Sequence, residues 1–219
     1  YLANNDPDGN LRYVGADPDN YVRFNNELWR IIGVFDGQVK LIRNEPYNNT
    51  GIAWDDNSDG SWLNNWATAS LKSLLNDGDT SVLKTIEKND STSYGYIDLN
   101  HVWNIGAYDD TYSTTGTRSN FYTAERSETP AGTSGSEATW TGAIGLMYPS
   151  DYGYASSGST ETCEGKEMYN WNTGEYITEC AEKSWLYDTN VISQWTLTPY
   201  SDYSGNDFYV SYTGLVGNA

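Results

Sequence analysis

Apolar and polar residues alternate near the start of the chain, in three runs separated by short turns. The runs are residues 21–24, 28–35 and 38–43, with Asn25 and Asn26 at the first turn and Asp36 and Gly37 at the second. An Asp-Gly pair between apolar runs favours a two-residue hairpin turn. The pattern therefore predicts a three-stranded antiparallel meander.

Two short helices are predicted after the meander. The first ends at the turn-forming residues 76–78, and the second is expected to begin at a capping Thr80. Their apolar positions recur with helical spacing. These positions are Leu71, Leu74 and Leu75 in the first helix and Val82, Leu83 and Ile86 in the second.

Turn-forming residues dominate the middle of the chain, and alternation returns at its end. We expect mostly loops over residues 91–159, including a long surface loop over 127–141, and strands at 195–198, 208–212 and 215–216. The length of 219 residues is enough to bury a core. The sequence therefore predicts a single domain over residues 1–219. It is of the α+β class, with a small antiparallel sheet, two short helices and long loops.

The chain is strongly acidic and rich in aromatic residues. It has 12 Lys and Arg against 30 Asp and Glu, a net charge of −18. Such a charge repels phosphate backbones and anionic lipid, so we expect no nucleic-acid partner and no membrane contact by this segment. The 9 Trp and 19 Tyr argue against simple disorder.

The two cysteines, Cys163 and Cys180, lie in a polar segment without the soft ligands of a zinc site. We expect one disulfide that closes a local loop, with two unrelated buried thiols as the alternative. A disulfide implies an oxidising, extracellular location.

Familiar catalytic motifs are missing from the sequence, and we expect no catalytic residue. It contains no nucleophile elbow, zinc-protease motif, P-loop or dinucleotide-binding fingerprint. The single histidine, His101, precedes an apolar run and is expected to be structural. The many carboxylates leave open an alternative function, a secreted carbohydrate-active enzyme that uses a carboxylate pair.

One acidic segment has the spacing of metal ligands. Asp55, Asn57 and Asp59 alternate before Gly60, and the carbonyl of Ser61 completes the first half of a calcium loop. Trp66 stands where an EF-hand has its bidentate Glu, so we expect a calcium-binding loop of another kind. The alternative is an acidic turn that caps the following helix.

Aromatic residues concentrate between residues 148 and 176, together with Asp and Asn. Carbohydrate rings stack on such aromatic faces, and carboxylates and amides orient hydroxyl groups. We therefore expect a ligand-binding patch here, with a buried aromatic layer as the alternative. The expected ligand-binding residues are Tyr148, Asp151, Tyr152, Tyr154, Tyr169, Asn170 and Trp171.

Several segments resemble a family of bacterial surface proteins. Residues 13–25 and 27–34 are similar to the opening of pilin-like secretion proteins and domains of unknown function from Gram-positive gut bacteria. Further similarities cover residues 102–106, 140–142, 145–155, 163, 169–171, 180, 185–187 and 194–200. Residues 195–200 also resemble the closing part of C-type-lectin-like and formylglycine-generating-enzyme-like domains.

The resemblance implies a C-type-lectin-like fold and an extracellular, cell-surface location. The implied function is a non-enzymatic surface protein, either a pilin-like filament subunit that associates with itself or an adhesin that binds a host or cell-surface glycan or protein. Family members continue past Asn218 into a closing strand. Without that strand, we expect a sheet edge that another chain can pair with.

Overall fold

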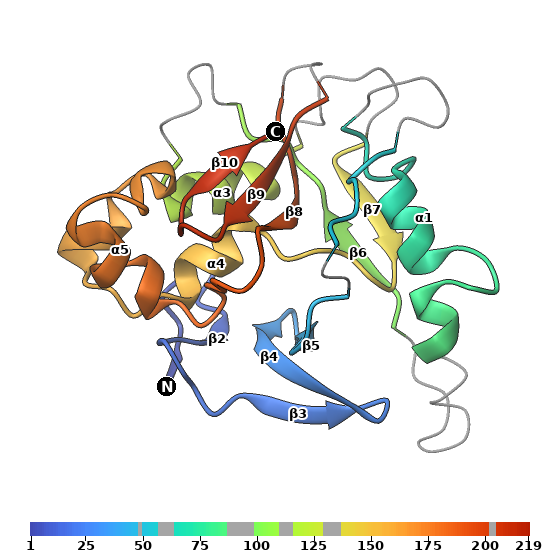
Figure 1. Ribbon diagram of the computed structural model, residues 1–219, viewed down its shortest axis with the longest axis horizontal. Helices are drawn as coiled ribbons and strands as arrows, with labels where there is room; N and C mark the ends of the chain where they lie inside the picture. The colour runs from blue at the N-terminus through green and yellow to red at the C-terminus, as the bar shows by residue number, and fades with distance from the viewer. Residues whose placement is uncertain (48–49, 57–63, 87–98, 110–115, 129–136, 202–204) are drawn as a thin grey trace.

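The first five strands form one curled antiparallel sheet, drawn in blue in Figure 1. β4 (Glu27–Phe35) pairs with three other strands, so it is the centre of this sheet. The other strands are β1 (Leu2–Ala3), β2 (Leu11–Tyr13), β3 (Tyr21–Phe24) and β5 (Gln38–Arg43). The computed structural model describes residues 1–47, 50–56, 64–86, 99–109, 116–128, 137–201 and 205–219.

Both turns of the predicted meander have the backbone that a two-residue hairpin requires. The φ angles are 54° and 61° at Asn25 and Asn26, and 50° and 77° at Asp36 and Gly37. Positive φ at both central residues matches the right-handed twist of the flanking strands. The predicted meander is therefore confirmed as β3, β4 and β5.

Two further groups of strands lie across the molecule from the first sheet. β6 (His101–Asn104) pairs with β7 (Thr139–Gly142), and β8 (Ser193–Pro199), β9 (Asp207–Ser211) and β10 (Val216–Asn218) form a three-stranded antiparallel sheet. The strands expected at the end of the chain are confirmed as β8, β9 and β10. The fold is therefore of the mixed α+β class.

The first predicted helix is confirmed as α1 (Ser70–Asn76), which buries Leu71 and Leu75. Residues 82–86 are also helical, as predicted. The expected cap at Thr80 is wrong by one residue, because the Ser81 hydroxyl accepts a hydrogen bond from the Lys84 N–H at 3.2 Å. Ser81 therefore fills the N-cap role that was expected of Thr80.

Two helices lie in the region that is predicted to be mostly loop. α3 (Arg118–Glu125) begins with a capping box between Thr117 and Asn120. α4 (Pro149–Ala155) is buried at all seven positions. A helix that is covered on every side has no amphipathic period, and this removes the signal on which the prediction relied.

The disulfide between Cys163 and Cys180 is confirmed, with the two Cα atoms 5.6 Å apart. Its surroundings differ from the expectation of an exposed polar loop, since both cysteines are fully buried. Short helical turns occupy the segment between the two cysteines and the residues that flank it. They are a π-turn at Thr160–Glu164, 3₁₀ turns at Met168–Asn170 and Ala181–Lys183, and α5 (Glu175–Glu179).

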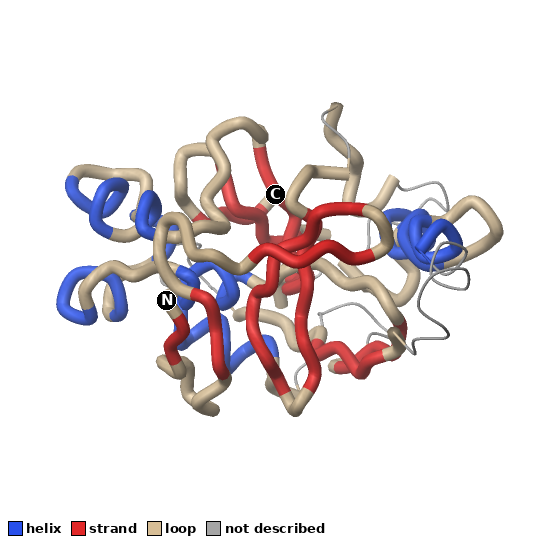
Figure 2. The backbone as a smooth tube through the Cα atoms, turned by 90° about the horizontal axis from the view of Figure 1, so that it is seen from below, coloured by secondary structure: helices blue, strands red, loops and turns tan. Residues whose placement is uncertain are grey.

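The buried side chains form two clusters. One surrounds the disulfide and contains Tyr152, Trp171 and Phe208, and the other contains Trp54, Trp66 and Leu197. Strands occupy the middle of the molecule, with helices toward both ends (Figure 2). Within the described residues, no helix is both long and apolar enough to span a membrane.

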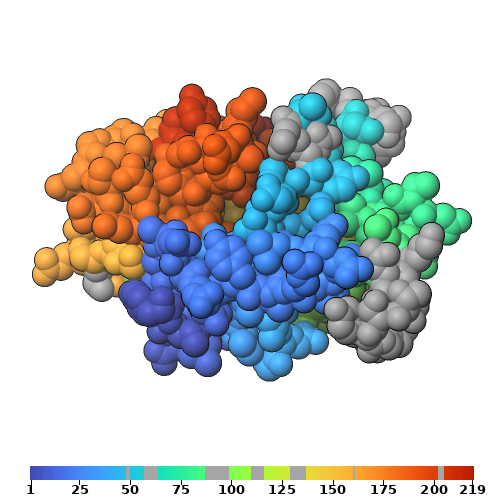
Figure 3. Space-filling view, turned by 60° about the horizontal axis from the view of Figure 1, so that its bottom comes forward, coloured from blue at the N-terminus to red at the C-terminus, as the bar shows by residue number. Residues whose placement is uncertain are grey.

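The first sheet and the segment around Trp185 meet on one face. Figure 3 shows the first strands in blue next to the orange C-terminal third. The indole N–H of Trp185 donates to the carbonyl of Tyr13 at 2.8 Å, and the Arg30 guanidinium stacks 4.4 Å from the Trp185 ring. These contacts hold the first sheet against the rest of the molecule and leave space beside β5.

Candidate functional site

Two adjoining cavities run along β5, and together they form what we call the β5 groove. The smaller has a volume of about 470 Å³ and includes residues 38–41, and the larger has a volume of about 660 Å³ and includes residues 40–44. The two cavities share six lining residues, namely Trp29, Lys40, Leu41, Trp103, Ile144 and Gly145. Ligand sites in proteins have volumes in this range.

Aromatic rings from both sides line the smaller cavity. Phe24, Trp29 and Phe35 come from the first sheet, and Trp103 and Tyr148 come from the opposite side. The Trp103 indole donates to the carbonyl of Gly142 at 2.9 Å, which fixes the ring. Glycine is required at Gly145, because a Cβ atom there would lie only 2.8 Å from the Trp103 ring.

The outer edge of β5 is open to the groove. The inner edge pairs with β4, whereas the outer backbone groups of residues 38–43 have no hydrogen-bond partner in the part of the chain that the structure describes. The indole N–H of Trp29 is also buried without a described partner. The groove thus combines apolar ring faces with free hydrogen-bonding groups.

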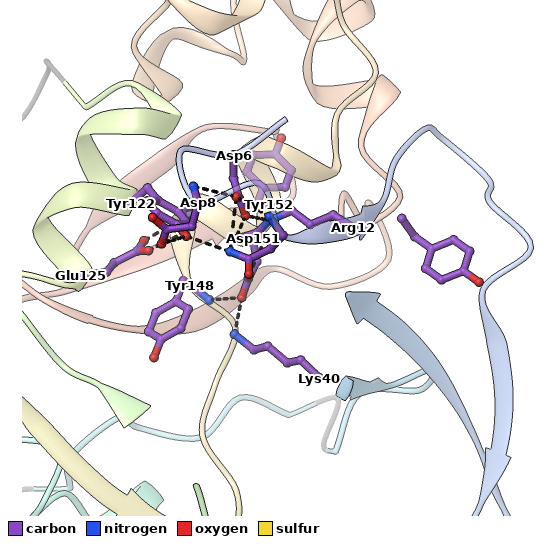
Figure 4. A network of polar contacts seen from close by, with 12 residues as sticks. Asp6, Asp8, Arg12, Lys40, Tyr122, Glu125, Tyr148, Asp151 and Tyr152 are labelled. Atoms are coloured by element: carbon purple, nitrogen blue, oxygen red, sulfur yellow. Dashed lines mark hydrogen bonds and ion pairs between the residues drawn. The ribbon is translucent and has the colours of Figure 1, made fainter. Parts of the chain in front are cut away.

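Lys40 projects from β5 into a cage of aromatic rings. Its ammonium lies 4.0 Å from the centre of the Tyr148 ring and 5.3 Å from that of Trp103, and it forms a 2.5 Å ion pair with Asp151 Oδ2. Burial lowers the pKa of Lys40, and the Asp151 carboxylate offsets part of that effect. The ion pair therefore joins β5 of the first sheet to α4 (Figure 4).

Asp151 is the point at which three parts of the chain meet. It stands in the first turn of α4, where its Oδ2 accepts the N–H of Tyr148 at 2.9 Å, and its Oδ1 pairs with Arg12 Nη1 at 2.8 Å. Burial alone would raise the pKa of Asp151, but Lys40 and Arg12 outweigh it and hold that pKa at about 2. The carboxylate is therefore ionised, and both of its oxygens form hydrogen bonds or ion pairs.

Arg12 extends the network to the start of the chain. Its Nε pairs with Asp6 Oδ2 at 2.6 Å, and its guanidinium lies 4.5 Å from the centre of the Phe35 ring. Asp6 in turn accepts the backbone N–H of Asn10 at 2.9 Å, which closes the turn before β2. Arg12 and Asp6 are both buried, so this ion pair holds β2 to the turn that precedes it within the core.

Glu125 is a second buried carboxyl group, but it lies outside the groove. Its oxygens accept the N–H and the hydroxyl of Ser150 and pair with Arg126 at 3.2 Å, and it lines neither cavity. Burial raises the pKa of Glu125, in contrast to Asp151. Divergent pKa values are typical of a carboxylate pair in glycosidases, but of these two buried groups Asp151 alone reaches the cavity, which Asp8 and Asp36 also line.

The residues of the predicted ligand-binding patch do not form one surface. Tyr148 and Asp151 line the smaller cavity. Tyr152, Tyr154 and Trp171 are 2% exposed or less, so the expectation of an exposed patch is wrong for them: these rings fill the core. Tyr169 is exposed, and the Asn170 amide donates to Glu167.

The predicted metal ligands Asn57, Asp59 and Ser61 lie outside the described residues. Asp55 is described, and its Oδ1 accepts the N–H of Ser70 at 3.2 Å, which gives α1 a cap from a distant residue. This contact fits the alternative of a helix-capping acidic turn. Among the described residues, no group of three or more His, Cys, Asp and Glu gathers to hold a metal ion.

His101, expected to be structural, opens β6 with its ring 5.7 Å from that of Trp103, and it lines the smaller cavity. The fold and the groove define a disulfide-containing α+β protein with an aromatic-lined cleft. No family model, curated protein or solved structure matches the chain.

We expect Asp151→Asn to lower the free energy of unfolding by about 3–5 kcal/mol, because it leaves Arg12 and Lys40 buried without a counter-charge. Glu125→Gln is the matched control and should cost markedly less, since the amide still offers Ser150 an oxygen acceptor. Urea unfolding at neutral pH measures both variants. Equal losses would contradict the special role of Asp151.

The same variant tests the pH dependence of stability. Because the pKa of Asp151 is lowered from 3.8 to about 2 in the folded protein, its stabilising effect is complete above about pH 4 and is lost as the pH falls toward 2. Acid unfolding of Asp151→Asn should therefore be shallower over this range than that of the wild-type protein.

Proposed function

We propose that this protein is an extracellular, non-enzymatic surface protein of the adhesin type, which binds a carbohydrate in the β5 groove. The observation that carries the proposal is the smaller cavity of about 470 Å³, which Trp29 and Trp103 line together with Phe35 and Tyr148. Sugar rings stack on such faces, and the outer backbone groups of β5 offer hydrogen bonds to hydroxyl groups.

The position of the buried acids supports binding over hydrolysis. A retaining or inverting glycosidase needs two carboxyl groups facing one cleft. Here the pKa of Glu125 is raised, but it lines neither cavity, while Asp151 lines the smaller cavity but is already paired with Lys40 and Arg12. The other two carboxyl groups of that cavity are Asp8, which accepts the Tyr122 hydroxyl, and Asp36, which stands in the turn between β4 and β5. The disulfide between two fully buried cysteines fits an oxidising, extracellular setting.

For the scaffold we propose a C-type-lectin-like arrangement in the pilin-like surface family. It is supported by the contact between the first strands and the end of the disulfide segment, where Trp185 donates to Tyr13. It is also supported by the long stretches between strands, which such scaffolds use to display binding sites. The partner would be a glycan on a host or neighbouring cell.

We expect the wild-type protein to bind a subset of a printed array of defined oligosaccharides, and Trp29→Ala to weaken that binding about tenfold or more, since a lost stacking partner costs about 1.4 kcal/mol. Tyr169→Ala is the matched control, because this exposed ring belongs to the sequence-predicted patch and lies outside the groove. Circular dichroism checks that both variants fold.

Two results would contradict this site. One is an array without any bound sugar. The other is a loss of binding in Tyr169→Ala that Trp29→Ala does not share, which would place recognition in the segment around Tyr169.

The open edge of β5 favours a second candidate function, that of a filament subunit. An extended strand from a neighbouring copy would pair with the outer backbone groups of residues 38–43 and lie in the same groove. Val39 faces Val34 across the pair next to the hairpin turn, so its N–H points to the open edge. This geometry makes Val39 a selective probe of edge pairing.

If the protein assembles through this edge, Val39→Pro should abolish self-association, because proline removes one edge donor without removing a bond to β4. Val39→Thr keeps the N–H and serves as the control. Sedimentation velocity over a range of concentrations measures the association. A wild-type protein that stays monomeric, or a proline variant that still assembles, would exclude strand exchange at β5.

A further inference from the structure

The larger cavity of the β5 groove is walled mainly by aliphatic side chains. Its volume is about 660 Å³, and its lining draws on β5, α1, β8 and the segments around residues 52, 82 and 144–146. Six of the aliphatic residues are only half-buried, so each leaves part of its surface open. They are Leu41, Ile42, Ile52, Val82, Ile144 and Leu146. Open apolar surface gathered in one place is typical of a binding site.

The main polar side chains of this cavity are already engaged within the protein. Arg43 pairs with Glu27 at 3.0 Å, and the Gln194 amide donates to a backbone carbonyl at 3.2 Å. The Asp188 carboxylate accepts the N–H of Asn190 at 2.8 Å. These contacts leave the aliphatic surface as the main binding feature of the walls.

Tertiary hydrogen bonds hold the walls of the larger cavity in position. The indole N–H of Trp195 in β8 donates to the carbonyl of Ile52 at 2.9 Å. Asn76, at the end of α1, donates to the carbonyl of Ile144 at 2.9 Å and accepts the N–H of the same residue at 3.0 Å. The cavity is therefore formed before a ligand arrives, which lowers the cost of binding.

The larger cavity adjoins the place proposed above for the sugar. Trp29 and Trp103, the rings on which the sugar would stack, line both cavities, as do Leu41 and Ile144. A second sugar ring in the larger cavity would press its hydroxyl groups against aliphatic walls and lose hydrogen bonds to water. A chain of CH₂ groups has no such bonds to lose, and its burial is favourable.

We propose that the carbohydrate bound in the β5 groove carries an alkyl or acyl chain, and that this chain lies in the larger cavity. The proposal rests on the carbohydrate-binding function proposed above, because that function places the sugar on Trp29 and Trp103. It extends that function by naming the class of ligand, an amphiphilic glycoconjugate whose polar end lies in the smaller cavity. The apolar end distinguishes such a ligand from a plain oligosaccharide.

Isothermal titration calorimetry with matched glycosides tests the proposal. The probes are the methyl and hexyl β-glycosides of glucose, galactose and N-acetylglucosamine, kept below the concentrations at which they aggregate. Each buried CH₂ group should tighten binding about three- to fourfold. Because several CH₂ groups separate the members of each pair, the Kd of the hexyl glycoside should be lower by about thirtyfold or more in at least one pair.

Two variants place the chain in the larger cavity. Val82→Phe adds a ring at the cavity wall and should weaken hexyl binding about tenfold, the effect of about two lost CH₂ groups, while methyl binding stays unchanged. Val102→Phe is the matched control, because Val102 is exposed and lines neither cavity. Ile192→Asn changes a wall residue that is 80% exposed, so it should fold normally and lower the hexyl advantage about threefold. Circular dichroism checks that all three variants fold.

Failure of the chain site and failure of the sugar site give different results. Hexyl glycosides that bind no more tightly than their methyl partners in all three pairs would overturn the chain site, and would leave the larger cavity to an apolar side chain of a strand paired with β5. A hexyl advantage that survives both Val82→Phe and Ile192→Asn would also overturn it, because the chain would then lie elsewhere. An oligosaccharide array without bound sugar, together with a hexyl advantage that Val82→Phe lowers, would contradict the sugar site alone.

Discussion

Asp151 holds together parts of the chain that are more than one hundred residues apart. Its carboxylate pairs with Arg12 of β2 and Lys40 of β5, and it accepts the N–H that begins its own helix α4. Burying these charges is unfavourable unless every one has a partner. Together with the Trp185 contacts, this one side chain therefore fixes the position of the first sheet relative to α4, and a shift of the sheet leaves a charge unpaired.

The β5 groove is a consequence of that arrangement. Lys40 joins the middle of β5 to α4, and of the two rings beside its ammonium Tyr148 lines the smaller cavity and Trp103 lines both. Because Lys40 is held by Asp151 at one point only, the rest of the outer β5 edge remains open. A binding cleft needs a rigid wall, exposed apolar ring faces and a few polar groups. Here the Lys40–Asp151 ion pair supplies the rigidity, and the open edge of β5 supplies the polar groups.

The elements that could be predicted from the sequence are those set by neighbouring residues, such as hairpin turns and amphipathic helices. The hairpins at Asn25 and Asp36 follow from turn chemistry, and α1 follows from the spacing of its leucines. The helix α4 escapes prediction because it is buried on every side, although Pro149 and Asp151 are typical helix-start residues. The groove escapes because Trp29, Lys40 and Trp103 meet only in the fold. One signal was available, since a lysine between Val39 and Leu41 in an apolar strand needs a buried counter-charge.

The central claim is that the Lys40–Asp151 contact couples the first sheet to α4, and a double-mutant cycle tests it most directly. The free energy of unfolding is measured for the wild-type protein, Lys40→Met, Asp151→Asn and the double variant. If the two residues act as a pair, the double variant loses less than the sum of the single losses, by about 1–3 kcal/mol. Strictly additive losses would mean that the two residues act independently and that the groove has another origin.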